Sequence, residues 1–453
     1  MTSTGNSDSA LRSWTLKTFE DATSAVLSFS FSGALGPAKG KSVIYALFKE
    51  TDSSFAFMVS LCSDTELYTQ PIDRYLVVLD RITGEIERTH RIELDVEECR
   101  KIFGCYTKSR ITKHTRFTDG SLSLSYKVTC REYETEDEVE YVVQLRHHAD
   151  VSSMNAIMQL VSSTIDPSVL PVPQVYPISD EGLQRTKLGM GIQITRFVSG
   201  IMGDRIYPSL SHENKLIFIK RLARAFGSLW NIPLPPERLI GELKARTNED
   251  DDRVELSVGP DRRYSLGGPF GTVADYLRAY IRARLFAFQK QQGIDEYKSQ
   301  YLKPVEDFVK KSMLNIPAIV EVIPVVPVNT DMALHNIIVS ETDPTNIMAI
   351  IDWEYCDSAP YACTFPVIEQ LFRQRADNGF GLEYPDGLSL RNEIPEWKRW
   401  NESEAGTVFL EWFCFGLFMK AEMRPGDVQG EEKANFWAEN KRVVEGFLAK
   451  YDS

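Results

Sequence analysis

Residues Val328 to Glu354, VNTDMALHNIIVSETDPTNIMAIIDWE, constrain the fold of this chain more than any other stretch. Two short apolar segments, IIV and IMAII, flank a polar turn, a pattern typical of a β-hairpin. Asp331 and Asn336 precede the first segment, and Asp352 follows the second. Carboxylate and carboxamide oxygens arranged in this way suit Mg²⁺ and phosphate. The stretch therefore predicts an oxygen-rich pocket at the end of a small sheet.

Length and composition limit the classes of protein to which the chain can belong. At 453 residues it exceeds what one core usually supports, so two or three structural units are expected. Its net charge of −13 argues against a nucleic-acid-binding surface. The seven cysteines are scattered without a CxxC pair, which favours reduced thiols over disulfides or a zinc site. With neither a leader pattern nor an apolar run long enough for a membrane span, we expect a cytoplasmic protein without membrane partners.

Hydrophobic periodicity divides the chain into a β-rich first part and a helical second part. Residues 1–112 predict a small β-rich extension with a hairpin at Thr83 and Gly84, and strand-like alternation resumes at about residue 113. Beyond Ser211, a plausible helix cap, the apolar residues recur at helical spacing. The polar stretch NEDDDRVELSVGPDRR is expected to be a solvated loop, and the chain after Glu354 is expected to be mostly helical.

The residues around Asp331 supply what phosphoryl transfer requires of a protein. That reaction needs phosphates held, their charge neutralised by Mg²⁺, and an acceptor hydroxyl positioned in line. A carboxylate beside the acceptor can orient it and accept its proton, and an amide oxygen with a second carboxylate can hold the metal. Asp331 is the candidate for the first role, and Asn336 and Asp352 are candidates for the second.

The segment resembles the aminoglycoside phosphotransferase family, which has a protein-kinase-like fold and a catalytic loop of the kind HGDLHPGN followed by IIDWE. Here NTDMALHN takes the place of that loop, so the resemblance implies that Asp331 is catalytic and that Asn336 and Asp352 bind metal. The segments GGPFGTVADYL and LPVPQVY look like fungal branches of the family. The implied fold is α+β and bilobal, with residues 113–200 as a nucleotide-binding lobe and residues 201–453 as a helical lobe. The implied cofactors are ATP and Mg²⁺.

The resemblance also assigns residues to nucleotide binding. DGSLSLSYKV is similar to the phosphate-covering hairpin, which places Gly120 and Ser121 near phosphate. YVVQLRHH is similar to the third strand, where Gln144 or Arg146 would replace the family's basic residue; both would lie on the same face of the strand. QITRFVSG is similar to the linker between lobes, where backbone groups of Arg196, Phe197 and Val198 would meet adenine.

Several residues depart from the family pattern. The glutamate that normally pairs with the strand base is missing, since Met154 or Asn155 occupies its place. Asn329 stands where the family has a histidine, and its amide can brace the loop in part, as an imidazole would. These departures leave open a pseudokinase-like binding protein, or a kinase fold reused in a fungal secondary-metabolite pathway.

Structural explanations compete with several of these assignments. Asp331 and Asn336 could cap turns, and Arg146 could be a solvated residue at a strand end. We expect His335 to pack or to bind backbone, Trp353 to be core, and the apolar helix around Trp412 to be core as well. The acidic run 249–252 is a solvated loop or a contact for a cationic acceptor. The partner is a small molecule, and neither its identity nor the oligomeric state can be deduced from the sequence.

Overall fold

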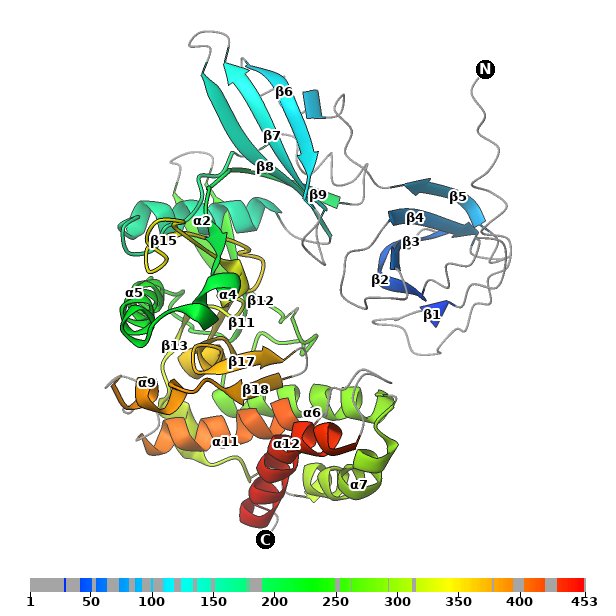
Figure 1. Cartoon of the computed structure of the whole chain (residues 1–453). Coiled ribbons are helices and arrows are strands. Elements are labelled where there is room, and N and C mark those ends of the chain that lie inside the picture. The colour runs from blue at the N-terminus through cyan, green and yellow to red at the C-terminus, as the bar shows by residue number, and fades with distance from the viewer. Residues whose placement is uncertain are drawn as a thin grey trace. The chain divides into compact units, whose positions relative to one another are not determined.

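The computed structural model divides the chain into two compact units (Figure 1). The first contains residues 1–151 and 175–197, and the second contains residues 152–174 and 198–453. The structure describes residues 28–29, 41–50, 54–62, 73–80, 86–91, 99–100, 109–117, 124–132, 137–147, 151–176, 178, 190–248, 253–261, 263–291, 293–311, 315–376, 379–393, 403–419 and 430–451. Gly120, Ser121 and the acidic run 249–252 lie outside these residues.

The first unit contains two antiparallel sheets. The N-terminal sheet follows chain order, with β1 (Ser28–Phe29), β2 (Lys41–Glu50), β3 (Ser54–Cys62), β4 (Asp73–Asp80) and β5 (Ile86–Arg91). The pairing of β4 with β5 confirms the hairpin predicted around Thr83 and Gly84, and the sheet as a whole confirms a β-rich extension.

The other sheet of this unit comprises β6 (Ser109–Arg116), β7 (Leu124–Glu132), β8 (Glu138–His147) and β9 (Met190–Arg196). Successive side chains of a strand point to opposite faces. Val143 and Leu145 of β8 pack in an apolar core with Ile192 and Ile194 of β9. The alternate positions of β8 therefore carry Gln144 and Arg146 on the opposite face, together on one side as the sequence predicts.

The described residues of the second unit form three small sheets. One consists of β10 (Ile201–Met202), β14 (Ile337–Val339) and β15 (Ile347–Ile350). Another has the order β12 (Val254–Gly259), β11 (Gly241–Thr247), β16 (Cys356–Pro360) and β13 (Val325–Asn329). The third pairs β17 (Arg373–Ala376) with β18 (Gly379–Glu383).

One prediction for this unit is wrong. The stretch expected to be a solvated loop contains β12, because Val254, Leu256 and Val258 alternate with polar residues and pair along β11. The acidic residues of this stretch made its period of two hard to recognise. Among the described residues after Glu354, helices predominate as predicted, although the strands β16, β17 and β18 also occur there.

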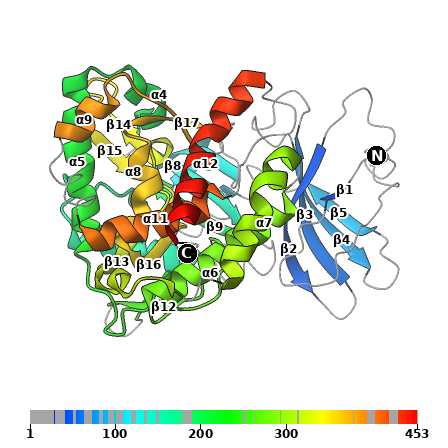
Figure 2. The ribbon, with the colours of Figure 1, turned by 90° about the horizontal axis from the view of Figure 1, so that it is seen from below.

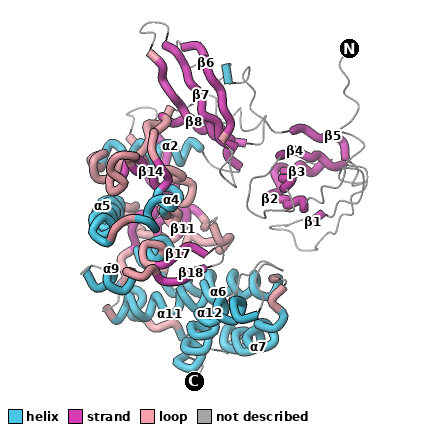
Figure 3. Tube along the Cα trace, in the orientation of Figure 1, coloured by secondary structure: helices cyan, strands magenta, loops and turns pink. Residues whose placement is uncertain are grey.

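Helices gather in the second unit (Figure 3). The longer ones are α2 (Val151–Thr164), α5 (His212–Trp230), α6 (Val273–Lys290), α7 (Asp295–Lys311), α11 (Glu404–Phe418) and α12 (Gly430–Tyr451). Short turns are α4 (Gly203–Ile206), α8 (Phe365–Glu369) and α9 (Gly387–Glu393). Ser211 caps α5 as predicted, since its side chain accepts a hydrogen bond from the backbone N–H of Asn214.

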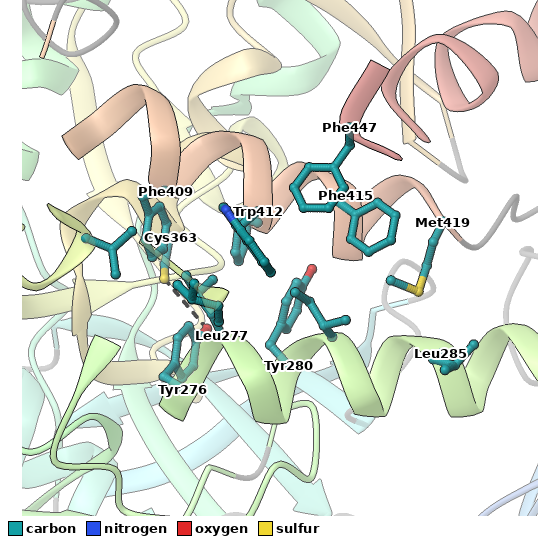
Figure 4. Packing of buried hydrophobic residues seen from close by; sticks show 14 of the residues in the cluster. Tyr276, Leu277, Tyr280, Leu285, Cys363, Phe409, Trp412, Phe415, Met419 and Phe447 are labelled. Atoms are coloured by element: carbon teal, nitrogen blue, oxygen red, sulfur yellow. Dashed lines mark hydrogen bonds between the residues drawn. The ribbon is translucent and has the colours of Figure 1, made fainter. Parts of the chain in front are cut away.

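The helical core lies where α11 packs on α6 and α12 (Figures 2 and 4). The ring of Tyr280 on α6 stacks on that of Phe413 with centroids 4.8 Å apart. A Cβ atom on Gly416 would lie 2.6 Å from the Tyr280 ring, so glycine permits this close approach. Trp412 is fully buried, which confirms that the apolar helix is core. Among the described residues, no helix is long and apolar enough to cross a membrane.

Candidate active site

The β14–β15 hairpin brings Asn336 and Asp352 to the same end of a sheet. Ile337 pairs with Ile350, and the backbone N–H of Ile351 donates to the Asn336 carbonyl at 2.9 Å. Asn336 is the last residue of the short 3₁₀ helix η4 (Leu334–Asn336), just before β14. Asp352 is the second residue after the end of β15. The structure therefore brings together the two residues that the sequence assigns to metal binding.

Asp331 is held by the same asparagine. The Nδ2 of Asn336 donates to the Asp331 carbonyl and to its carboxylate Oδ2, each at 2.8 Å. The carboxylate is about one-fifth exposed, and its other oxygen, Oδ1, accepts no hydrogen bond from the described residues. One carboxylate oxygen is thus fixed, and the other is left for a ligand.

The side chain of Asn329 forms hydrogen bonds with the backbone of both Asp331 and Asp352. It is completely buried, its Oδ1 accepts the backbone N–H of Asp331 at 2.9 Å, and its Nδ2 donates to the Asp352 carbonyl at 3.5 Å. The expectation that an amide can brace the loop in place of the family's imidazole is confirmed by these bonds.

Asp352 has the unusual backbone of the segment. Its φ of 62° lies in the left-handed region, which residues other than glycine rarely adopt. Trp353, which follows it, is buried, and its indole N–H donates to the Ile350 carbonyl at 2.8 Å. This hydrogen bond anchors the chain next to the strained residue, and Trp353 is core as predicted. Such strain is concentrated at functional sites, where surrounding structure maintains it.

The residues at this end of the hairpin fit a hard cation. Because the Nδ2 of Asn336 is engaged by Asp331, Oδ1 is the atom that this side chain can offer to a cation, at the same end of the hairpin as Asp352. Oxygen ligands of this kind suit Mg²⁺, which usually takes only one or two carboxylates and completes its shell with water and phosphate. The part of the chain that the structure describes has no cluster of three or more His, Cys, Asp or Glu residues that could hold a metal unaided.

Two basic side chains, His335 and Arg263, stabilise the ionised form of Asp331. Burial alone would raise the pKa of this carboxyl, but His335, Arg263 and the hydrogen bond from Asn336 keep it below its ordinary value. The Nε2 of His335 lies 3.8 Å from Oδ2, and the Nη2 of Arg263 lies 3.7 Å from Oδ1. The site therefore presents an ionised carboxylate at neutral pH. His335 thus contacts the candidate base, in addition to the packing or backbone bonding expected of it.

Sequence reasoning also missed Arg263. Its Nη1 donates to Thr330 Oγ1, and its guanidinium lies 4.9 Å from the centre of the Tyr355 ring. The arginine belongs to the segment between β12 and α6, and β12 reaches the site only because β11 pairs with both β12 and β16. The only signal in the sequence was a pair of arginines in a stretch taken for a solvated loop.

A buried acid, Asp357, shares Thr330 with Arg263 as a hydrogen-bonding partner. The Oδ2 of Asp357 is 3.3 Å from Thr330 Oγ1. Burial and the neighbouring Asp261 raise the pKa of Asp357 to about 7, although Arg263 and Thr330 act in the opposite direction. Both acids line a cavity of about 10 Å³, room for roughly one water.

In the first unit, Arg146 is 2% exposed, which excludes the solvated alternative for this residue. Its Nε donates to Gln193 Oε1 at 2.9 Å, and its Nη2 donates to Gln144 Oε1 at 3.0 Å. Gln144 in turn donates to the Ser125 hydroxyl at 3.2 Å. The two predicted phosphate contacts thus belong to one hydrogen-bonded row across β7, β8 and β9.

The predicted adenine contacts lie where β9 ends. The backbone N–H of Phe197 donates to the Glu140 carbonyl at 3.0 Å, so this donor is already engaged within the sheet. The Phe197 ring lies 3.7 Å from the Nζ of Lys127. Arg196 is exposed, and Val198 is half-buried.

Helix α2 carries Met154 and Asn155 where the family has an acid, and both residues are buried. The hydroxyl of Ser153 accepts the backbone N–H of Ala245 on β11 at 2.8 Å. This helix thus packs against β11 of the second unit.

A large part of the sequence matches a known protein family. Residues 113–401 match the family model described as the phosphotransferase enzyme family, APH. No curated protein sequence matches significantly. An aminoglycoside phosphotransferase solved with GDP and kanamycin aligns at a TM-score of 0.44 and 11% identity, over 79% of this chain and 99% of that one. One from Alicyclobacillus acidocaldarius aligns at 0.39 and 11%, over 77% and 93%. Because the family model spans more than half of the sequence, the chain belongs to the phosphotransferase enzyme family and has its kinase-like fold.

Proposed function

We propose that the protein is an ATP- and Mg²⁺-dependent phosphotransferase that transfers the γ-phosphate to a hydroxyl of a small molecule. The observation that carries this proposal is the fixed carboxylate of Asp331, with Oδ2 bound by Asn336 and Oδ1 open. A base that orients an acceptor needs one oxygen held and one available. The family membership supports the same class of reaction.

Asp331 positions the acceptor hydroxyl through Oδ1 and accepts its proton as the new bond forms. The Asn336 amide keeps the carboxylate from rotating, and Asn329 holds the backbone beneath it. The Oδ1 of Asn336 and the Asp352 carboxylate would hold Mg²⁺. When bound, that ion neutralises phosphate charge.

Nucleotide binding is assigned to residues 113–200 as part of this proposal. Arg146 with Gln144 would contact the phosphates, together with the Gly120 and Ser121 turn, and the segment Arg196 to Val198 would contact adenine. The hydrogen-bonded row around Arg146 supports a fixed position for its guanidinium. A fungal source, a cytoplasmic location and a secondary metabolite as acceptor stay predictions from the sequence.

The test is phosphoryl transfer by the full chain from Mg·ATP to a panel of small alcohols. The release of ADP measures the turnover. We expect Asp331→Asn to lower turnover by about 10²- to 10⁴-fold, the usual contribution of a positioned base. Asp307→Asn, which removes a partly exposed carboxylate on α7, serves as the control and should retain full turnover.

Thermal unfolding with and without Mg·ATP separates binding from transfer. Stabilisation by Mg·ATP that persists in Asp331→Asn, with transfer lost, supports the proposal. Unchanged turnover in that variant rejects the role of Asp331. Stabilisation of the wild type without transfer to any alcohol would instead identify a nucleotide-binding pseudokinase.

A further inference from the structure

The open oxygen of Asp331 has a cation beside it. Oδ2 is engaged by Asn336 at 2.8 Å and lies near His335, whereas Oδ1 lies 3.7 Å from the Nη2 of Arg263. That separation is longer than a hydrogen bond, so Arg263 does not take the position of a donor on Oδ1. An acceptor hydroxyl bound to Oδ1 would therefore be next to the guanidinium.

The guanidinium has donors to offer a ligand. It carries five N–H groups, and among the described residues it donates one hydrogen bond, from Nη1 to Thr330. The rings of Tyr355 and Tyr264 lie 4.9 Å and 5.6 Å from its central carbon. Its side chain is 23% exposed. The aromatic rings hold the group in place, and part of the side chain as a whole stays exposed.

The nearby acids do not fully cancel the positive charge. Burial raises the pKa of Asp357 to about 7, and burial also raises the pKa of Asp261. At neutral pH Asp357 therefore carries less negative charge than an exposed aspartate. Arg263 keeps one ionised partner, Asp331, at a distance too long for a hydrogen bond.

We propose that Arg263 determines the class of acceptor by binding an oxyanion, a carboxylate or a phosphate ester, carried close to the acceptor hydroxyl. A planar guanidinium can bind such a group through two parallel hydrogen bonds. An acceptor that carries an ammonium group in the same position would be repelled by the positive charge of Arg263. This charge is permanent, since arginine stays protonated. This inference rests on the proposed function, because it places the acceptor at Asp331. It also reverses the cationic acceptor that the acidic run 249–252 suggested.

Binding tests the inference without knowledge of the natural acceptor. Glucuronate, glucose and glucosamine share a pyranose ring and carry negative, zero and positive charge. Their affinities for the full chain with Mg·ADP are measured by calorimetric titration at constant ionic strength. We expect glucuronate to bind at least tenfold more tightly than glucosamine, with glucose between them.

Three variants assign the preference to this residue. Arg263→Gln should remove the tenfold difference, and Arg263→Lys should retain part of it because the charge remains without the planar fork. Arg278→Gln, which removes a partly exposed arginine paired with Asp275 on α6, is the matched control and should behave as wild type. Circular dichroism checks that each variant is folded. If Arg263→Gln does not fold, Arg263→Lys still tests the inference.

Tighter binding of glucosamine, equal binding of the three probes, or an anion preference that survives both Arg263 variants overturns the inference. Failure of the proposed function looks different. Anion-selective binding that depends on Arg263, without transfer of labelled γ-phosphate to any probe or alcohol, supports an anion site and rejects the phosphotransferase. A preference for anions should also persist in Asp331→Asn, where transfer is lost.

Discussion

Two arginines in this protein have opposite surroundings. Arg146 on β8 is 2% exposed, and two glutamine side chains accept hydrogen bonds from it. Arg263, in the segment before α6, is 23% exposed and donates a single hydrogen bond to the residues that the structure describes, next to the carboxylate proposed as the base. Arg146 lies in a regular strand, whereas Arg263 lies in an irregular connection.

The difference separates a fixed charge from an available one. The hydrogen bonds of Arg146 make its position a property of the sheet, so any phosphate role must use a guanidinium that is already held. Arg263 keeps donors in reserve at the place where an acceptor would bind. Burial and bonding, more than residue type, therefore distinguish the two roles.

Arg146→Met should give the largest effect on stability at neutral pH. It removes the donor to Gln193 and Gln144 and leaves their oxygens in a buried row, which should cost about 2–4 kcal/mol in the free energy of unfolding. Urea denaturation measures this loss, and Arg146→Lys, which keeps a charged donor, is the milder control. Equal stabilisation of wild type and Arg146→Met by Mg·ATP would show that Arg146 has no phosphate role and is structural only.

Asn329→Ala should have an intermediate effect, confined to the neighbourhood of Arg263. The backbone N–H of Asp331 loses its acceptor and the Asp352 carbonyl loses its donor. We expect a loss of about 1–2 kcal/mol in stability, and turnover about tenfold lower because the base is less well positioned. Asn329→His, which restores the family residue, should recover part of the turnover. Full activity of the alanine variant would show that the brace is not needed.

The effect that is smallest at neutral pH concerns Asp357, the buried acid near Arg263. Between the ordinary pKa of 3.8 and the folded value of about 7, Asp357 is protonated in the folded protein and ionised in the unfolded chain. Its contribution to stability is therefore present at low pH and declines as pH rises from about 4 to 7, by at most about 1.4 kcal/mol per pH unit.

Asp357→Asn removes this titration, so the difference in unfolding free energy between wild type and variant should follow that slope and become flat above pH 7. Asp307 is the control of opposite sign, because its hydrogen bond with Lys303 lowers its pKa and its contribution is lost only in acid. A difference that does not change between pH 4 and 7 would mean that Asp357 has an ordinary pKa.

The sequence by itself determined the hairpin with Asp331, Asn336 and Asp352 around it, the alternation that pairs Gln144 with Arg146, and the helices of the core. Each of these depends on contacts within a short segment or on a regular period. The bond from Asn336 to Asp331 spans five residues, and the Arg146–Gln144 bond spans two. Local geometry is enough to predict such neighbours.

Only the tertiary structure decided that Arg263 contacts the candidate base. Thr330 and Arg263 are 67 residues apart in the chain. Their contact depends on the sheet order β12-β11-β16-β13, in which β11 pairs with a strand that follows it by more than a hundred residues. The Ser358 hydroxyl fixes that pairing by donating to the Leu239 carbonyl at 2.6 Å, across 119 residues. Pairings between distant segments leave no periodic trace in either segment, which is why the arginine could be placed only by the folded chain.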